Sequence, residues 1–244
     1  MTLPIHCELA EVRVLELFGP SSGGKSSLAK RLLTAPGDGR VFTLAQDRLL
    51  ERVGLGWLSG HLARTLALDA LAALAVLATW RAARAYYAFS AAHAFRGAGS
   101  ASFGLRLNLL RNAWKAVALR LVAPRFAAPG EVLLMDEGPL QTANYLLVRA
   151  DGAPSLAAVE AFLAVVPLPD AAVYVRLDEE ALVRRTLSRG HPRVHDGSRS
   201  ASRRFVRNAL AAFDRIAAEP RVAERLLLRE ALAPSEPAVK EAAS

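Results

Sequence analysis

The fold is decided by residues 12–32, which read VRVLELFGPSSGGKSSLAKRL. Residues 12–18 are rich in branched and apolar side chains and run directly into Gly19, as is typical of a buried strand in a parallel sheet. A helix is expected to begin near Ser26, because the leucines that follow then share one face, and to end at Pro36. This stretch therefore predicts a strand, a glycine-rich loop and a helix in succession.

Strand-like segments recur along the chain of 244 residues. They are residues 41–45, 131–135, 171–177 and, more weakly, 226–228. Helical stretches separate these segments, and strands joined by helical crossovers form parallel sheets that are covered on both faces. We therefore expect an α/β fold and a single domain over residues 1–244.

Residues 19–26, GPSSGGKS, fit the phosphate-binding pattern G-x-x-x-x-G-K-[S/T], known as the P-loop or Walker A motif, at every fixed position. Glycines let backbone N–H groups encircle phosphate oxygens, and the helix that follows points its positive end at them. Lys25 would reach the β and γ phosphates, and the Ser26 hydroxyl would bind Mg²⁺. A glycine-rich turn that only caps a helix would not need this Lys-Ser pair. The expected phosphate-binding residues are Gly19, Ser21, Ser22, Gly23, Gly24, Lys25, Ser26 and Ser27.

An acidic pair ends the third strand, in residues 133–139, LLMDEGP. The strand delivers Asp136 to the carboxyl edge of the sheet, where ligands of open α/β sheets bind, so Asp136 is the expected protein partner of Mg²⁺. The alternative for Asp136 is a turn-forming residue after a strand. Glu137 would activate water in a motor-type or transport ATPase, and in a kinase it would contact the acceptor or shape the site.

Asp47 follows the second strand and is therefore expected at the same edge, facing the glycine-rich loop across the sheet. A carboxylate there could accept the proton of an acceptor hydroxyl as that hydroxyl attacks the γ phosphate. A plain helix N-cap is an equally weighted alternative, and the two roles can coexist. Arg48 either binds the acceptor or pairs with Glu51.

Two arginines follow the fourth strand. Arg185 and Arg189 are four residues apart and therefore lie on one face of a helix, and residues 194–204, rich in Ser, Gly and Arg, are expected to form a mobile loop. Guanidinium groups that close over a transferring phosphoryl group would offset its charge and exclude water, so residues 185–204 are expected to form a lid. The alternative is that each arginine is an ordinary surface residue exposed to solvent.

The segment of about residues 47–130 is far longer than one crossover requires and looks helical almost throughout. Its most apolar part, residues 70–80, is shorter than the roughly 20 residues of a membrane span, so we expect no transmembrane segment. Aromatic and arginine side chains crowd residues 80–96, and we favour a long helix that packs on the core with its arginines in solvent. A peripheral membrane contact through about residues 62–96, or a pocket for an acceptor, stays open.

The formal charge of +8 would suit an anionic partner. Of the 31 basic residues, 27 are arginine, a bias that a GC-rich genome also produces, so we do not expect a nucleic-acid partner. The single cysteine, Cys7, excludes an internal disulfide, and residues 1–14 lack the pattern of a signal peptide. We therefore expect a cytoplasmic protein. His191 and His195 have no acidic or cysteine residues near them at metal-ligand spacing, so we expect no zinc site.

These motifs together resemble the nucleoside-monophosphate-kinase-like group of P-loop kinases. SSGGKSSLAKRL at residues 21–32, followed by VFTLAQDRLL at residues 41–50, is most similar to chloramphenicol phosphotransferases and their relatives. The resemblance implies a P-loop NTPase three-layer sandwich with strand order 2-3-1-4-5 and a long helical insertion between strands 2 and 3. It also implies phosphoryl transfer from ATP, with Asp47 near the acceptor hydroxyl and a lid that closes on ATP.

The sequence thus predicts a Mg²⁺-dependent kinase that moves the γ phosphate of ATP to a hydroxyl or phosphate of a small molecule. Lys25, Asp47, Arg185 and Arg189 are the expected catalytic residues. A P-loop ATPase that couples hydrolysis to a conformational change or a partner is the main alternative, with Glu137 positioning water. A degenerate nucleotide-binding regulator is a third, against which the intact Lys25, Ser26 and Asp136 argue. The acceptor and the oligomeric state are not specified by these motifs.

Overall fold

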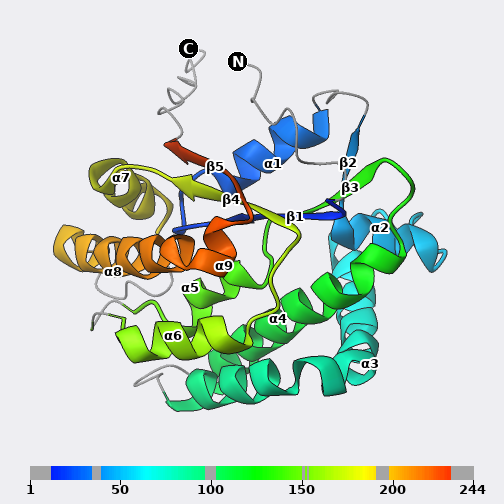
Figure 1. The fold of residues 1–244 in the computed structure, drawn as a ribbon, viewed down its shortest axis with the longest axis horizontal. Helices are drawn as coiled ribbons and strands as arrows, with labels where there is room; N and C mark the ends of the chain where they lie inside the picture. Colours follow the sequence, from blue (N-terminus) through cyan, green and yellow to red (C-terminus); the bar gives the residue numbers. More distant parts are fainter. Residues whose placement is uncertain are drawn as a thin grey trace, which may run out of the picture.

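The computed structural model describes residues 12–34, 40–96, 103–149, 152, 154–190 and 198–231. Within these residues the chain forms a five-stranded sheet (Figure 1). Its strands are β1 (Val14–Phe18), β2 (Val41–Leu44), β3 (Glu131–Met135), β4 (Ala171–Arg176) and β5 (Leu226–Ala231). All neighbouring strands are parallel and their order is β2-β3-β1-β4-β5, which confirms the expected strand order.

Helices connect the strands. The α-helices are α1 (Lys25–Thr34), α2 (Ala45–Arg52), α3 (His61–Arg96), α4 (Phe103–Val122), α5 (Ala143–Leu146), α6 (Leu156–Val165), α7 (Glu179–Arg189), α8 (Arg199–Ala218) and α9 (Pro220–Ala223), and short 3₁₀ helices occur at η2 (Ala123–Arg125) and η3 (Leu140–Thr142). The helical segment expected between the second and third strands is therefore present as α2, α3, α4 and η2.

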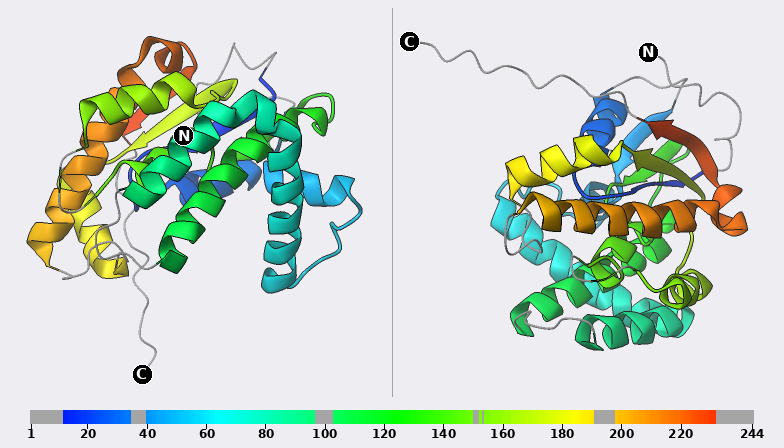
Figure 2. Two further views of the ribbon diagram at one scale, coloured as in Figure 1. Left: turned by 90° about the horizontal axis from the view of Figure 1, so that it is seen from below. Right: turned by 90° about the vertical axis from the view of Figure 1, so that its left-hand side faces the viewer.

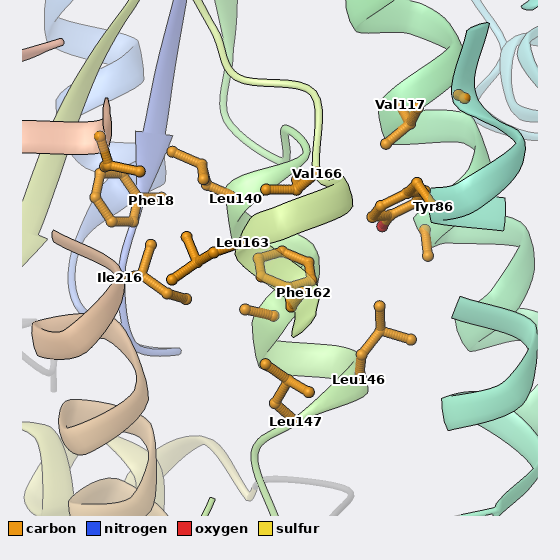
Figure 3. Packing of buried hydrophobic residues seen from close by; sticks show 14 of the residues in the cluster. Phe18, Tyr86, Val117, Leu140, Leu146, Leu147, Phe162, Leu163, Val166 and Ile216 are labelled. Carbon is orange, nitrogen blue, oxygen red and sulfur yellow. The ribbon is translucent and has the colours of Figure 1, made fainter. Parts of the chain in front are cut away.

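The sheet has helices on both faces. Helix α1 lies on one face, and α4, α6 and α8 lie on the other (Figure 1). Because side chains alternate along a strand, Leu15 and Leu17 pack with the apolar face of α1, whereas Phe18 points into the larger cluster on the opposite side. That cluster also contains Tyr86 of α3 and Phe162 of α6, both fully buried (Figure 3).

Helix α3 bends sharply at Ala83, whose φ and ψ of −120° and 16° are not helical (Figure 2). The half after the bend supplies Tyr86 and Tyr87 to the core, as expected of a helix that packs on the domain. Leu74 and Leu77 in the first half are exposed.

One helix within the described ranges, His61–Phe95, is long and apolar enough to cross a membrane, with 28% of its most apolar stretch buried. The helix is longer than its most apolar part, residues 70–80, because it continues through Asp69 and Arg81. Asp69 forms ion pairs with Lys115 and Arg111 of α4, which keeps its carboxylate inside the fold. A single helix of this kind is weak evidence for a membrane span.

Candidate functional site

The glycine-rich loop, residues 19–24, joins the buried end of β1 to the start of α1. Gly19 has a φ of 142°, and a Cβ atom at this position would lie 2.3 Å from the carbonyl oxygen of Val175 on β4, so only glycine fits here. The loop then turns back on itself, because the N–H of Gly23 donates to the carbonyl oxygen of Pro20. Ser22 adopts a φ of 65°, which is uncommon for a residue other than glycine and which the sequence pattern did not predict.

Two side chains from the segment after β3 hold this loop. The N–H of Gly19 donates to Oε1 of Gln141 at 3.0 Å, and Nδ2 of Asn144 donates to the hydroxyl of Ser21 at 2.9 Å. Gln141 and Asn144 are both buried. Sequence reasoning missed these residues, since more than one hundred positions separate each from its partner and no local pattern marks them.

Lys25 begins α1 and folds back over the loop. Its Nζ donates to the carbonyl oxygens of Gly19 and Pro20, at 3.0 and 2.9 Å. Burial lowers the pKa of Lys25 to about 8, although the nearby carboxylates of Glu137 and Asp136 oppose this shift. The ammonium group is therefore held where an anion at the loop could replace the two carbonyl oxygens.

A cavity of about 360 Å³ opens above the loop, and we call it the loop cavity. Its wall contains Asp136 and Glu137 after β3, Asn112 of α4 and Arg189 of α7. The loop and the first residues of α1 also line it, with Ser21, Ser22, Gly23, Gly24, Lys25, Ser26 and Ser27. The structure thus brings the acidic pair, the Lys-Ser pair and one of the two expected arginines to one cavity.

The donor set of the loop cavity fits Mg²⁺ in the company of phosphates. Ser26 and Asp136 offer a hydroxyl and a carboxylate oxygen there, and Mg²⁺ in nucleotide sites takes one or two protein ligands while phosphates and water supply the rest. Among the described residues, no group of three or more His, Cys, Asp or Glu side chains could hold a metal by itself. Such a site would therefore depend on the ligand for most of its oxygens.

Both arginines expected in a lid lie near the loop. Nη1 of Arg185 is 3.4 Å from the carbonyl oxygen of Ser22, to which it donates, and Arg189 lines the loop cavity one turn later on α7. The expected loop over residues 194–204 was wrong from Arg199 onward, because α8 begins there and is capped by the Ser198 hydroxyl. Residues 191–197, with His191 and His195, lie outside the described residues.

Asp47 does not line the loop cavity. Its carboxylate accepts a hydrogen bond from Arg64 of α3, and it lies in the first turn of α2 rather than at the helix cap. The N-cap interpretation was wrong, because Leu44 occupies that position. Arg48 pairs with Glu51, as one alternative expected, and also with Glu131 at 3.0 Å.

A second cavity, of about 260 Å³, adjoins the loop cavity, and we call it the side cavity. Asn112, Asp136 and Glu137 line both cavities. Gln46, which precedes Asp47, and Lys115 line the side cavity alone. No local pattern marks Gln46, Asn112 or Lys115, because their meeting depends on how α2 and α4 pack against β3.

Glu16, in the middle of β1, is a fully buried carboxyl group that sequence reasoning also missed. Its Oε1 accepts a hydrogen bond from the N–H of Gln141 at 2.9 Å, and Gly138 packs directly on it, since a Cβ there would lie 2.3 Å from its Cδ. Burial raises the pKa of Glu16 to about 8. The N–H groups of Gln141 and Leu140 and the charge of Arg120 lower this pKa, but by less than burial raises it. Glu16 therefore supports the residue that holds Gly19.

A comparison of the chain with known protein families, curated proteins and solved structures found no match. The chemistry of the site must therefore be argued from its own geometry. The loop cavity offers a lysine and an arginine for an anionic ligand, and two carboxylates that line the side cavity as well.

Proposed function

We propose that the protein is a P-loop phosphotransferase that moves the γ phosphate of ATP to a small-molecule acceptor in a Mg²⁺-dependent reaction. The observation that carries the proposal is the loop cavity, where the glycine-rich loop, Lys25 and Ser26 lie with Asp136 and Arg189. A phosphate-binding loop needs this combination of N–H groups, ammonium and hydroxyl. The sheet order of the structure is compatible with the kinase group that the sequence resembles.

Each residue has a distinct role in this proposal. Lys25 and the N–H groups of the loop bind the β and γ phosphates, while Ser26 and Asp136 hold Mg²⁺, which neutralises phosphate charge when bound. Arg185 and Arg189 offset charge on the transferring group. The side cavity supports transfer to a small molecule, because it joins the loop cavity at Asp136 and Glu137.

Replacement of Lys25 tests the nucleotide site. Lys25→Ala should weaken the binding of a fluorescent ATP analogue with Mg²⁺ at least about tenfold, because a charge-assisted contact to phosphate is lost. Lys30→Ala is the matched control, since Lys30 lies on the same helix and is exposed. Equal affinity in Lys25→Ala and the control would contradict the proposal.

An ATPase that drives a partner is the second candidate, because exposed Glu137 lines both cavities and could position water. The kinase should release ADP slowly alone and faster when a pool of metabolites supplies the acceptor, with a phosphorylated product by mass spectrometry. In the ATPase, Glu137→Gln should abolish basal hydrolysis and trap ATP, while no small molecule becomes phosphorylated. That second pattern would replace the kinase by the ATPase.

A further inference from the structure

The side cavity has a polarised wall. Its boundary with the loop cavity carries the carboxylates of Asp136 and Glu137, whereas Lys115 lies one turn beyond Asn112 on α4 and lines the side cavity alone. Leu44, Leu119 and Met135 supply apolar wall between polar groups. Among the residues that line the side cavity, all of which are described, Lys115 is the one cation. A ligand that fills this space meets acids at the loop end and an ammonium group elsewhere.

The charge of Lys115 is only partly neutralised within its cluster. Its Nζ lies 3.3 Å from Oδ1 of Asp69, and Nη1 of Arg111 lies 3.0 Å from Oδ2 of the same carboxylate. Two cations thus share one anion, and the cluster of three keeps one positive charge. The Lys115 side chain is 20% exposed and belongs to the cavity wall, whereas the Arg111 side chain is 52% exposed and does not line it.

A lysine in this position favours an anion as its second partner. Partial burial strengthens its attraction to a ligand charge relative to water, and a carboxylate or phosphate can also accept hydrogen bonds from the ammonium group. The cavity of about 260 Å³ is smaller than the roughly 300–1,000 Å³ pockets that hold drug-sized ligands. The volume therefore suits a molecule smaller than these ligands, and Lys115 suits one that carries an anionic group.

Resting on the proposed function, we propose that the phosphoryl acceptor is a small hydroxylated anion, whose carboxylate or phosphate binds Lys115 while its hydroxyl lies beside Glu137. In the transfer, the hydroxyl oxygen forms a bond to the γ phosphorus as the bond from that phosphorus to the bridging oxygen of ATP breaks. ADP leaves with the electron pair of that bond, and the hydroxyl proton passes to the carboxylate of Glu137, which lines both cavities. Lys115 thus determines specificity.

Binding of simple anions tests this assignment without a known acceptor. The loop cavity is first saturated with Mg²⁺ and a non-hydrolysable ATP analogue, and inorganic phosphate or acetate is then titrated by calorimetry. At least one of the two anions should bind the wild-type protein about tenfold more tightly than Lys115→Met, because a charge-assisted contact is lost. Lys115→Arg should retain most of the affinity, and comparing the two anions distinguishes a phosphate group from a carboxylate.

Arg111→Met is the matched comparison, since Arg111 shares Asp69 but does not line the cavity, and its loss should weaken anion binding less than the loss of Lys115 does. Asp69 keeps one cationic partner in each variant, so both should fold. Equal anion binding in wild type and Lys115→Met would overturn the proposal.

Acceptor-stimulated release of ADP gives a second measurement, with glycerol, glycerate and glycerol 3-phosphate as the matched series. An anionic member should stimulate release at least about tenfold more than glycerol, and Lys115→Met should remove that preference. A preference for glycerol, or no preference, would count against the anionic acceptor. Failure of the nucleotide site is distinguishable, because it would appear as unaltered binding of the ATP analogue in Lys25→Ala.

Discussion

In the proposed nucleotide site, Lys25 is the residue whose ionisation should most directly affect ligand binding. Burial places its pKa at about 8, and a phosphate ligand binds the charged form. The affinity for Mg²⁺ and a non-hydrolysable ATP analogue should therefore be constant below pH 8 and fall above it, by up to about tenfold for each pH unit until the pKa of the complex is reached. Binding measured by fluorescence between pH 6.5 and 10 checks this.

Lys25→Arg is the control for that profile, because an arginine stays charged throughout this range. The affinity of Lys25→Arg for the ATP analogue should be lower than that of the wild type at pH 7. Between pH 8 and 10 it should decline less than the affinity of the wild type does. If wild type and Lys25→Arg show the same decline, another group titrates and Lys25 is not its source.

Glu16 gives the folded chain a pH dependence of its own. An unfolded glutamate ionises near pH 4.5, whereas buried Glu16 keeps its proton until about pH 8, so the folded state binds more protons between these values. The free energy of unfolding should therefore fall as pH rises from 4.5 to 8, by up to about 1.4 kcal/mol per unit. Glu16→Gln, which resembles the protonated acid, should remove this decline and be the more stable protein at pH 8.

Urea unfolding of both proteins at pH 5 and pH 8 measures this difference. Glu16→Ala serves as a contrast, because it leaves the N–H of Gln141 without its acceptor and should destabilise the fold at both pH values. If the wild type is as stable as Glu16→Gln at pH 8, ionisation of Glu16 does not lower the free energy of unfolding, and the prediction is wrong.

Helix α7 presents the two arginines to the loop as a unit, four residues and about one turn apart. If their contacts strengthen as charge develops on the transferring phosphoryl group, Arg185→Ala and Arg189→Ala should lower kcat by about tenfold or more with a smaller change in ATP affinity. Arg184→Ala, exposed on the same helix, should behave as the wild type. Steady-state kinetics of the three variants measure this difference. If all three variants resemble the wild type, Arg185 and Arg189 are surface residues with no role in transfer.

At the scale of the whole molecule, stability depends on the cluster between the sheet and α3, α4, α6 and α8 (Figure 3). Phe162 lies fully buried there, whereas Leu77 on the first half of α3 is 73% exposed. Phe162→Ala should lower the free energy of unfolding by about 3–5 kcal/mol, and Leu77→Ala should change it by about 0.5 kcal/mol or less. Thermal or urea unfolding measures both variants. Equal decreases in the free energy of unfolding would mean that the first half of α3 is covered in solution.

Much of the fold could be predicted from local sequence. The strand at residues 131–135 and the start of the helix after the glycine-rich loop were placed within one residue, because apolar runs, glycines and prolines act through neighbouring residues. The strand order was implied by the family resemblance rather than by these patterns, and the sheet confirms it. The start of α8 was missed, since a stretch rich in Ser, Gly and Arg carries no apolar periodicity at its first turn.

The site divides in the same way. The sequence by itself determined the glycine-rich loop, the Lys-Ser pair and the acidic pair, because each is a contiguous pattern at the end of a strand. Only the tertiary structure decided that Gln141 binds Gly19, that Asp47 pairs with Arg64, and that Lys115 lines the side cavity. These contacts join residues far apart in the chain, and their positions follow from how helices pack on the sheet, which no local pattern encodes.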